Sequence, residues 1–358
     1  MGTQMFHTTV TERNSFRTCR RSWHLGTVRR LSTKGKVTWY FLFGDMVHAA
    51  LEEYYKRDRN LDDALAELDR QWRLHDDQLR LTYGNLYNTE EVSEYWAGEK
   101  ERAESMLINY DRFDREHPFF NRVLDMSIEE RSFVEILDPQ GEPIKNALLS
   151  GKIDMVVECE DGVWIVDHKT LSSIPSDSAL DIDDQITAYC YIYWRTTGVM
   201  PRGGMYNVLI KDPPKPPRQL KNGSLSKDKS QRTTYDLYIR EIDNLGLTGD
   251  LPEYEEILSY LEEKGWSQFY VRLKSERNME QLANFEKHLF HEYADMDEAL
   301  EFQDQLYPNP SQYTCPRCPY LPICKAMEEG SDPEYVISHG YEVLEPRHTI
   351  PEEFVNAS

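Results

Sequence analysis

Residues 151–170 read Gly-Lys-Ile-Asp-Met-Val-Val-Glu-Cys-Glu-Asp-Gly-Val-Trp-Ile-Val-Asp-His-Lys-Thr. Two apolar runs flank Asp161–Gly162, and an Asp-Gly pair is the strongest short signal for a two-residue hairpin turn. With these two residues in the turn, Asp154 lies opposite Lys169, and Asp167 lies one diagonal position away. Because side chains alternate along a strand, all three charged groups share one face. The stretch therefore predicts a β-hairpin that brings two carboxylates and one ammonium together at its open end.

These three groups suit metal-assisted chemistry. Two acids at this spacing fit a hard divalent cation such as Mg²⁺, which prefers oxygen ligands. The lysine would hold or deprotonate an attacking water, or neutralise charge that develops on a phosphate. The alternative is a surface hairpin with a simple salt bridge. Against that alternative, Val163 and Ile165 precede Asp167 and Lys169 on the same face, so the charges extend a stripe of core residues.

The same residues carry a family pattern. Gly151, Asp154, Asp167, Lys169 and Thr170 form a Gly-x-x-Asp strand followed by Asp-x-Lys-Thr. This pattern resembles the PD-(D/E)XK nuclease superfamily, in its RecB-like branch of the CRISPR-associated exonuclease type. The resemblance implies an α/β fold, with a central mixed sheet flanked by helices, a helical insert and an iron–sulfur cap. It also implies a nuclease that depends on Mg²⁺ or Mn²⁺.

His48 stands in Gly-x-x-x-His-x-x-Leu-Glu, on an amphipathic helix expected at 44–57. A lone histidine beside an apolar stripe is usually a packed core residue. The resemblance instead implies that His48 binds the metal together with Asp154 and Asp167, with the carbonyl of His168 as an additional ligand.

Gln185 and Tyr189 are four residues apart and therefore share one face of a helix expected at 183–195. As a pattern alone the pair is weak, but it follows Lys169 by fewer than twenty residues. The resemblance implies that both side chains contact DNA or the metal-bound water, and we count them with the catalytic residues.

Cys315, Cys318 and Cys324 form C-x2-C-x5-C in a proline-rich segment. Three thiolates so close together are a ligand set for a soft metal centre, and Cys19 is the candidate for the fourth. This arrangement resembles the iron–sulfur staple of RecB-like exonucleases, which implies a 4Fe-4S cluster. Zinc bound by four cysteines is the alternative that the spacing leaves open. We expect the two remaining cysteines to be buried and structural.

The composition describes a large, acidic chain of 358 residues with 39% hydrophobic residues, which suffices for a core. No run of about 18 apolar residues is present, and the first ten residues lack the apolar segment of a signal peptide. We therefore expect a cytoplasmic protein without a membrane span, located in the host cytoplasm if a phage encodes it.

The net charge of −22 argues against non-specific coating of nucleic acid. Two segments are nevertheless basic. Residues 13–36 hold eight Lys and Arg and no acid, and residues 211–232 hold seven against two aspartates. We expect the first to face phosphate rather than form an ordinary solvated face. The second reads as an extended loop, either a flexible linker or a loop that closes over DNA.

The predicted organisation is a single nuclease domain at 1–325, followed by an acidic tail at 326–358. We divide the domain into four parts: a basic, cysteine-bearing segment at 11–36, a helical region at 44–118, a nuclease core at 127–300 and a cluster-binding segment at 313–325.

The predicted activity is that of a metal-dependent DNA exonuclease. It would act on DNA that is single-stranded or has a free end, in phage or host recombination, repair or processing, and would be phage-encoded. A catalytically silent DNA-binding accessory on the same fold is the alternative. Cleavage polarity is not encoded in these motifs, and an oligomer is compatible with them.

Overall fold

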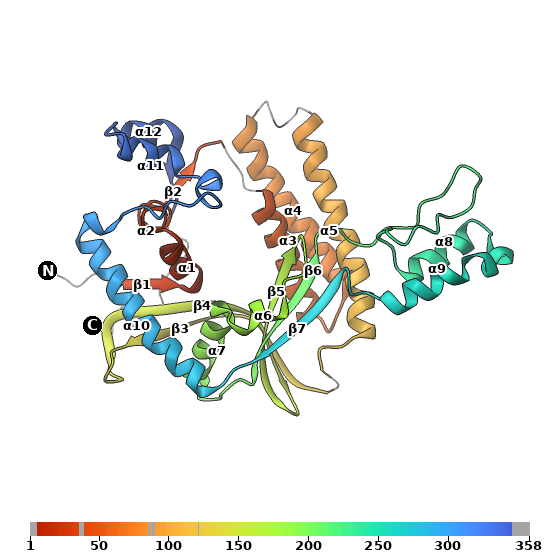
Figure 1. Ribbon diagram of the computed structural model, residues 1–358, viewed down its shortest axis with the longest axis horizontal. Coiled ribbons are helices and arrows are strands. Elements are labelled where there is room, and N and C mark those ends of the chain that lie inside the picture. Colours follow the sequence, from red (N-terminus) through yellow and green to blue (C-terminus); the bar gives the residue numbers. More distant parts are fainter. Residues whose placement is uncertain (1–5, 36–38, 85–86, 88–89, 121, 346–358) are drawn as a thin grey trace.

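The fold comes from a computed structural model, which describes residues 6–35, 39–84, 87, 90–120 and 122–345. Within this described part, a six-stranded mixed sheet lies at the centre, with helices on both of its faces (Figure 1). The α/β fold predicted from the sequence is therefore confirmed. The last residues of the predicted acidic tail, 346–358, lie outside the described residues.

The longest strand, β4, organises the sheet. β3 pairs with β4 along one edge, so the parallel strand β1 and the antiparallel strand β5 share the other edge. β6 then runs parallel to β5, and β7 runs antiparallel to β6. The strands are β1 Phe6–Thr9, β3 Val123–Leu137, β4 Pro143–Cys159, β5 Gly162–Leu171, β6 Gly203–Ile210 and β7 Tyr270–Glu276.

The β4–β5 hairpin forms with a turn one position earlier than predicted. Residues 160–161 make the turn, and Gly162 begins β5 with φ of +124°, a conformation that favours glycine. Val156 pairs with Ile165, whereas the predicted register would have placed Val156 opposite Asp167. The observed register matches apolar with apolar residues. Each β4 residue thus faces a partner two positions earlier on β5 than predicted, and an even shift keeps every side chain on its predicted face.

Helices cover both faces of the sheet, and each face has its own hydrophobic core. On one face, three helices, α3 (Trp39–Lys56), α4 (Leu61–Tyr83) and α5 (Glu90–Glu116), pack on a cluster that includes Met155, Val166 and Met205. On the other face, two helices, α7 (Asp184–Thr197) and α10 (Met279–Glu301), pack on a cluster that includes Ile165 and Val208. Because both faces are covered, every residue of β6 is buried.

α3 and α7 lie close to the helices predicted at 44–57 and 183–195, and α3, α4 and α5 occupy the predicted helical region at 44–118. The helix bounds are α3 Trp39–Lys56, α4 Leu61–Tyr83, α5 Glu90–Glu116, α6 Asp177–Asp181, α7 Asp184–Thr197 and α10 Met279–Glu301. In the described residues, none of the helices is both long and apolar enough to span a membrane.

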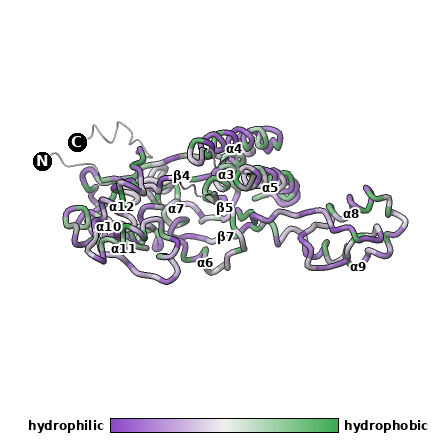
Figure 2. The backbone as a smooth tube through the Cα atoms, turned by 90° about the horizontal axis from the view of Figure 1, so that it is seen from above, coloured by the Kyte–Doolittle hydropathy of each residue, from purple (hydrophilic) through white to green (hydrophobic). Residues whose placement is uncertain are grey.

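Residues 211–269 form a lobe that extends away from the sheet (Figures 1 and 2). It consists of the irregular segment 211–234, which includes the loop predicted at 211–232, then α8 Tyr235–Asn244, a short 3-10 helix η3 Thr248–Asp250 and α9 Leu251–Lys264. Leu225 of the irregular segment is buried with Tyr238, Tyr254 and other residues of the two helices. The segment is therefore packed onto its own small core, which disagrees with a flexible linker.

The two ends of the chain pack against one another. Cys19 is extended (φ −164°, ψ 112°) and separates two short helices of the N-terminal segment. The N-terminal elements are α1 Val10–Thr18, α2 Arg20–Trp23, a short π-helix η1 His24–Val28 and β2 Leu31–Thr33. The C-terminal elements are η4 Gln303–Gln305, η5 Cys315–Arg317, α11 Leu321–Glu328, α12 Pro333–Gly340 and β8 Tyr341–Val343. β2 and β8 form an antiparallel pair, so part of the acidic segment after residue 326 is ordered secondary structure.

Candidate active site

The predicted acids and lysine meet where β4 and β5 diverge. Met155 pairs with Val166, so the next position along places Asp154 beside Asp167. The backbone N–H of His168 donates to Asp154 Oδ2 over 2.8 Å. Lys169 Nζ lies 2.6 Å from Asp167 Oδ2. Asp167 is only 3% exposed, which agrees with charges that extend a core stripe and disagrees with a surface salt bridge.

The two carboxylates differ in their ease of ionisation. Burial raises the pKa of Asp167 to about 6, although Lys169 opposes this shift. Burial also disfavours charge on Asp154, but the contact with His48 outweighs it and lowers the pKa of Asp154. Burial likewise disfavours charge on Lys169, yet Asp167 raises the pKa of Lys169, which therefore stays an ammonium. The site thus holds one carboxylate that ionises readily, one carboxylate whose ionisation burial disfavours, and one cation.

His48 reaches the site from α3. Its neighbours Val47 and Leu51 are fully buried, and His48 itself lies at the edge of that stripe with a side chain 34% exposed. Its Nδ1 lies 3.5 Å from Asp154 Oδ2. Despite partial burial, the contact with Asp154 raises the pKa of His48. The structure therefore brings His48 to the acid pair.

Gln185 and Tyr189 reach the same centre from α7. Gln185 Oε1 accepts a hydrogen bond from Lys169 Nζ over 2.8 Å. Gln185 Nε2 donates to the Tyr189 hydroxyl at 2.9 Å and to Asp167 Oδ1 at 3.4 Å. The predicted i, i+4 pair thus forms one hydrogen-bonded chain that ends on Lys169 and Asp167.

His168 contributes its backbone to the site, while its side chain points to the opposite face of the sheet. There the ring stacks on Tyr55, with centroids 5.8 Å apart, and Asn207 Nδ2 donates to its Nδ1 over 2.9 Å. Burial lowers the pKa of His168 to about 3, so the ring is neutral.

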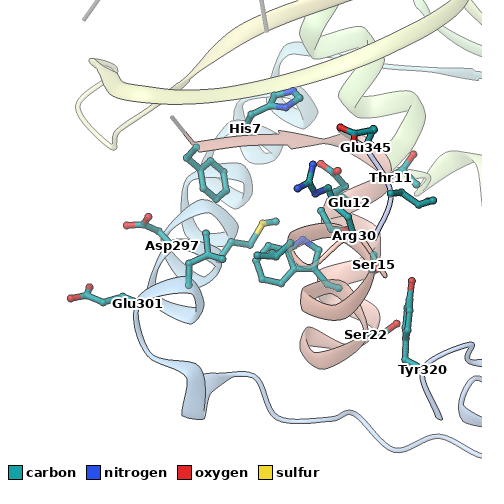
Figure 3. Close-up of a pocket in the computed structure, with 18 of the residues that line it drawn as sticks. His7, Thr11, Glu12, Ser15, Ser22, Arg30, Asp297, Glu301, Tyr320 and Glu345 are labelled. Carbon is teal, nitrogen blue, oxygen red and sulfur yellow. The ribbon is translucent and has the colours of Figure 1, made fainter. Parts of the chain in front are cut away.

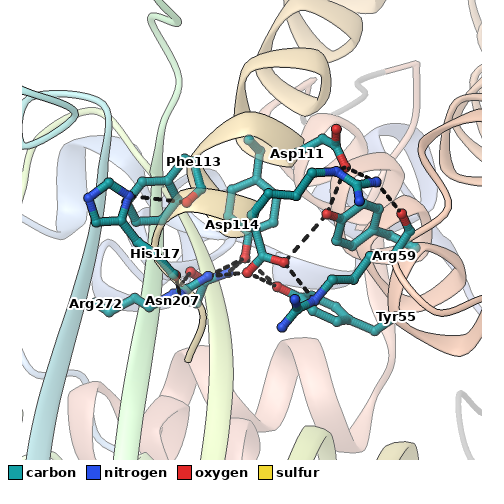
Figure 4. Close-up of polar contacts among 11 residues, drawn as sticks. Tyr55, Arg59, Asp111, Phe113, Asp114, His117, Asn207 and Arg272 are labelled. Carbon is teal, nitrogen blue, oxygen red and sulfur yellow. Dashed lines mark hydrogen bonds and ion pairs between the residues drawn. The ribbon is translucent and has the colours of Figure 1, made fainter. Parts of the chain in front are cut away.

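A buried polar network continues behind His168. Asn207 also donates to the Tyr110 hydroxyl over 2.7 Å, and the Tyr110 and Tyr55 hydroxyls lie 2.6 Å apart. Asp114, fully buried, accepts from Tyr55 and pairs with Arg272 and with Arg59 (Figure 4). Sequence reasoning missed this network. The sequence signal for it was Asn207, a polar residue in the largely apolar strand β6. A buried polar side chain requires hydrogen-bond partners, so Asn207 indicated polar groups nearby.

A comparison with protein families agrees with this geometry. The family model described as PD-(D/E)XK nuclease superfamily matches residues 7–325. This chain belongs to the PD-(D/E)XK nuclease superfamily. The predicted superfamily is thereby confirmed, and the membership implies a metal-dependent nuclease that acts on DNA. Among curated proteins, no match to the chain was found.

The donor set of this PD-(D/E)XK site fits a hard divalent cation. Two carboxylates and an imidazole converge. Within the described part of the chain, Asp167 Oδ2 is buried without a well-directed hydrogen bond, beside the Lys169 ammonium. Oxygen and imidazole donors suit Mg²⁺ or Mn²⁺. As the described side chains stand, no three His, Cys, Asp or Glu form a ready metal-binding group.

The four predicted cluster cysteines lie in the segments where the chain ends meet, each partly exposed. The backbone N–H of Asn309 donates to the Cys19 sulfur over 3.4 Å, and that of Ser311 to the Cys315 sulfur over 3.2 Å. The N-terminal segment reaches the other two sulfurs. Ser22 Oγ lies 3.9 Å from Cys318 Sγ, and Arg21 Nη1 lies 3.3 Å from Cys324 Sγ.

The donors around these sulfurs suit metal-bound thiolates, whose sulfurs commonly accept hydrogen bonds. A group of three metal-binding side chains is not formed among the described residues here either. The other two cysteines, Cys159 and Cys190, are buried elsewhere, as expected.

The N-terminal basic segment is largely neutralised by acids, contrary to the expectation that it faces phosphate. Its ion pairs reach α7, α10, α11 and α12. They are Arg13 with Asp184 and Glu292, Arg17 with Asp184 and Glu292, Arg20 with Asp295, Arg21 with Glu328, and Arg29 with Glu334. These arginines mainly join the two ends of the chain, because their charges are satisfied within the protein.

A pocket of about 890 Å³ lies between α1, the end of α10 and the C-terminal segment (Figure 3). None of the predicted catalytic residues lines it. Its charged lining is mainly acidic, with Glu12, Asp297, Glu301 and Glu345 against Arg30. This charge does not suit a phosphate backbone, so the acid pair on the hairpin remains the candidate active site.

Proposed function

We propose that this PD-(D/E)XK nuclease is a DNA exonuclease of the RecB-like, CRISPR-associated type, using Mg²⁺ or Mn²⁺. The observation that carries the proposal is the meeting of Asp154, Asp167, Lys169 and Gln185 at the end of one hairpin. The order of the motifs along the chain supports the exonuclease type. We also propose that the protein acts in the cytoplasm, in phage or host DNA recombination, repair or processing.

The residues would divide the work as follows. Asp154, Asp167 and His48 would hold the cation, with the His168 carbonyl as an additional ligand. The bound cation would supply a Lewis acid and a more acidic water. Lys169, kept as an ammonium beside Asp167, would orient the attacking water and offset negative charge on the phosphate. Gln185 and Tyr189 would fix Lys169 and position the DNA strand.

Digestion of end-labelled single-stranded and double-stranded DNA with Mg²⁺, Mn²⁺ or a chelator tests this proposal. We expect metal-dependent release of short products from a strand end. A closed circular substrate should resist cleavage. Cleavage of the circle would contradict the exonuclease type. Binding of DNA without cleavage in either metal would favour the catalytically silent accessory.

We further propose that Cys19, Cys315, Cys318 and Cys324 bind a 4Fe-4S cluster, with zinc as the alternative. The hydrogen-bond donors on three of the sulfurs support a thiolate site. Purified protein should be brown and contain iron. Cys19→Ala should lose iron and colour together, while Cys159→Ala, at a buried cysteine elsewhere, should keep both. Colourless protein that contains zinc would establish the alternative.

We also propose that the lobe holds the DNA backbone. β6 ends at Ile210, which pairs with Leu171, two positions beyond Lys169. The lobe therefore begins at the same end of β5 and β6 as the candidate catalytic residues. In the irregular segment, Lys227 and Lys229 pair with acids of α9, whereas Arg218 and Lys221 form no ion pair with any described residue. These two exposed cations are the candidates for phosphate contact.

A further inference from the structure

An ion cluster fastens the first residue of α7 to two other helices. Arg13 and Arg17 of α1 reach Asp184 Oδ2, at 3.2 and 2.7 Å. Both also reach Glu292 of α10, at 2.6 and 3.4 Å. The Arg13 side chain is 0% exposed and lies over the ring of Phe285. A charge buried this deeply depends on its partners, so the cluster fixes the relative positions of the three helices.

The residue after Asp184 is Gln185, which holds Lys169 at 2.8 Å and also contacts Asp167. One peptide unit therefore separates the ion cluster from the candidate catalytic centre. At its other end, α1 leads directly into Cys19, whose backbone N–H still donates to Ser15. The same short helix thus connects the cysteine site with the first turn of α7.

We propose that Arg13 and Arg17 are positioning residues, which hold the first turn of α7 so that Gln185 stays on Lys169 and Asp167. The proposal rests on the proposed nuclease function. Neither arginine touches the reacting groups, and each acts through Asp184 and the backbone of α7.

Arg277 forms a second anchor on α7. Arg277 donates from Nε to Thr187 Oγ1 over 2.9 Å and from Nη2 to the Leu180 carbonyl over 2.8 Å. It holds the start of α7 and the end of α6 independently of α1. Loss of Arg17 should therefore shift the first turn of α7 without unfolding the helix. Arg17 is the better residue to change, because its side chain is 37% exposed whereas Arg13 is fully buried.

A double-mutant cycle between Arg17 and Gln185 tests the proposal. The measurement is the single-turnover rate of DNA cleavage by the metal-loaded protein. In the wild-type background, Arg17→Met should slow cleavage about tenfold. In the Gln185→Ala background, the same substitution should slow cleavage less than about twofold, because the residue through which Arg17 acts is then absent. Arg17→Lys should restore part of the rate. The matched control is Arg29→Met, which breaks an ion pair of the same segment with α12 and should leave the rate unchanged.

Amide hydrogen exchange at residues 185–189 supplies a readout that needs no activity. Exchange there should be faster in Arg17→Met and unchanged in Arg29→Met. If wild type cuts no DNA, the nuclease proposal fails, and the exchange result alone decides whether the arginines position α7. Equal slowing in both backgrounds of the cycle, together with unchanged exchange, would overturn the inference.

Discussion

At the residue scale, Asp167 occupies the least favourable position of the site. It is almost fully buried, burial raises its pKa, and its Oδ2 lies against the Lys169 ammonium without a well-directed hydrogen bond from the described residues. Carboxylates with perturbed pKa values cluster at functional sites. A divalent cation between Asp154 and Asp167 would satisfy both acids, which gives a physical reason for placing two carboxylates so close together.

Asp167→Asn should lose metal-dependent cleavage by at least about 10²-fold, the scale of removing one preorganised electrostatic group. Folding and DNA binding should be retained, since the amide keeps the shape of the carboxyl group. The measurement is cleavage of end-labelled DNA beside a binding isotherm. Glu158→Gln, an exposed change on β4, the other strand of the hairpin, is the control and should cut normally. Cleavage by Asp167→Asn at the control's rate would refute the assignment of the site.

A substitution of Asn207 tests the buried polar network behind the hairpin. Asn207→Leu removes the donor to His168 Nδ1 and to the Tyr110 hydroxyl. Each buried group left unsatisfied costs about 1–3 kcal/mol, so urea unfolding should show a clear loss of stability. The Mn²⁺ concentration for half-maximal cleavage should also rise, because the His168 backbone N–H holds Asp154. Val208→Ala, next in the strand, should lower stability without this change in metal requirement.

At the element scale, Gly151 shows why the motif begins with glycine. A Cβ at this position would lie 2.7 Å from Ile192 Cδ1 and 3.0 Å from Tyr189 Cε1, both on α7. The absence of a side chain therefore allows α7 to pack closely on β4, and this packing holds Gln185 and Tyr189 of α7 beside Lys169 and Asp167.

Gly151→Ala should lower the free energy of unfolding by about 1–3 kcal/mol, as overpacking of a core does. It should also slow cleavage, because Tyr189 must move. Ile192→Val removes the nearest contacting atom, so the Gly151→Ala/Ile192→Val protein should recover part of the stability in urea unfolding. A double variant no more stable than Gly151→Ala would show that the contact with Ile192 is not the cause.

The elements that sequence predicted well are those set by local periodicity. The helix stripe of Val47 and Leu51 and the alternation of Val163 and Ile165 each fix which face is buried, whatever packs against it. The hairpin register depended instead on pairing between strands. The Asp-Gly signal favoured a turn at residues 161–162. The turn lies at residues 160–161 instead, which pairs the apolar Val156 with the apolar Ile165.

Long-range pairings could not be predicted from local pattern. Arg13 and Glu292 are 279 positions apart, so nothing near either residue indicates the other. A run of arginines without acids therefore suggested a phosphate-facing surface, whereas the acids that neutralise it come from α7 and the C-terminal third of the chain.

At the scale of the whole molecule, this internal neutralisation changes where DNA binding is expected. With a net charge of −22 and most arginines of residues 13–36 paired, the N-terminal segment serves mainly as a clamp between the chain ends. The lobe is then the better candidate for phosphate contact, because it begins beside the candidate catalytic residues and carries exposed cations.

Changing Arg218 and Lys221 together to Ala tests the lobe. Removing one cation that binds a phosphate should reduce the slope of log K against log salt by roughly 0.7 for a single strand, so the slope should flatten by about 1.4, and affinity should fall for all sequences alike. The matched control is Lys227→Ala/Lys229→Ala, which removes the same charge from the same segment. Its slope should change less, because Glu253 and Glu256 already neutralise those lysines. Equal slopes for wild type and the Arg218/Lys221 variant would exclude the lobe as the phosphate-binding surface and would return that role to the N-terminal segment.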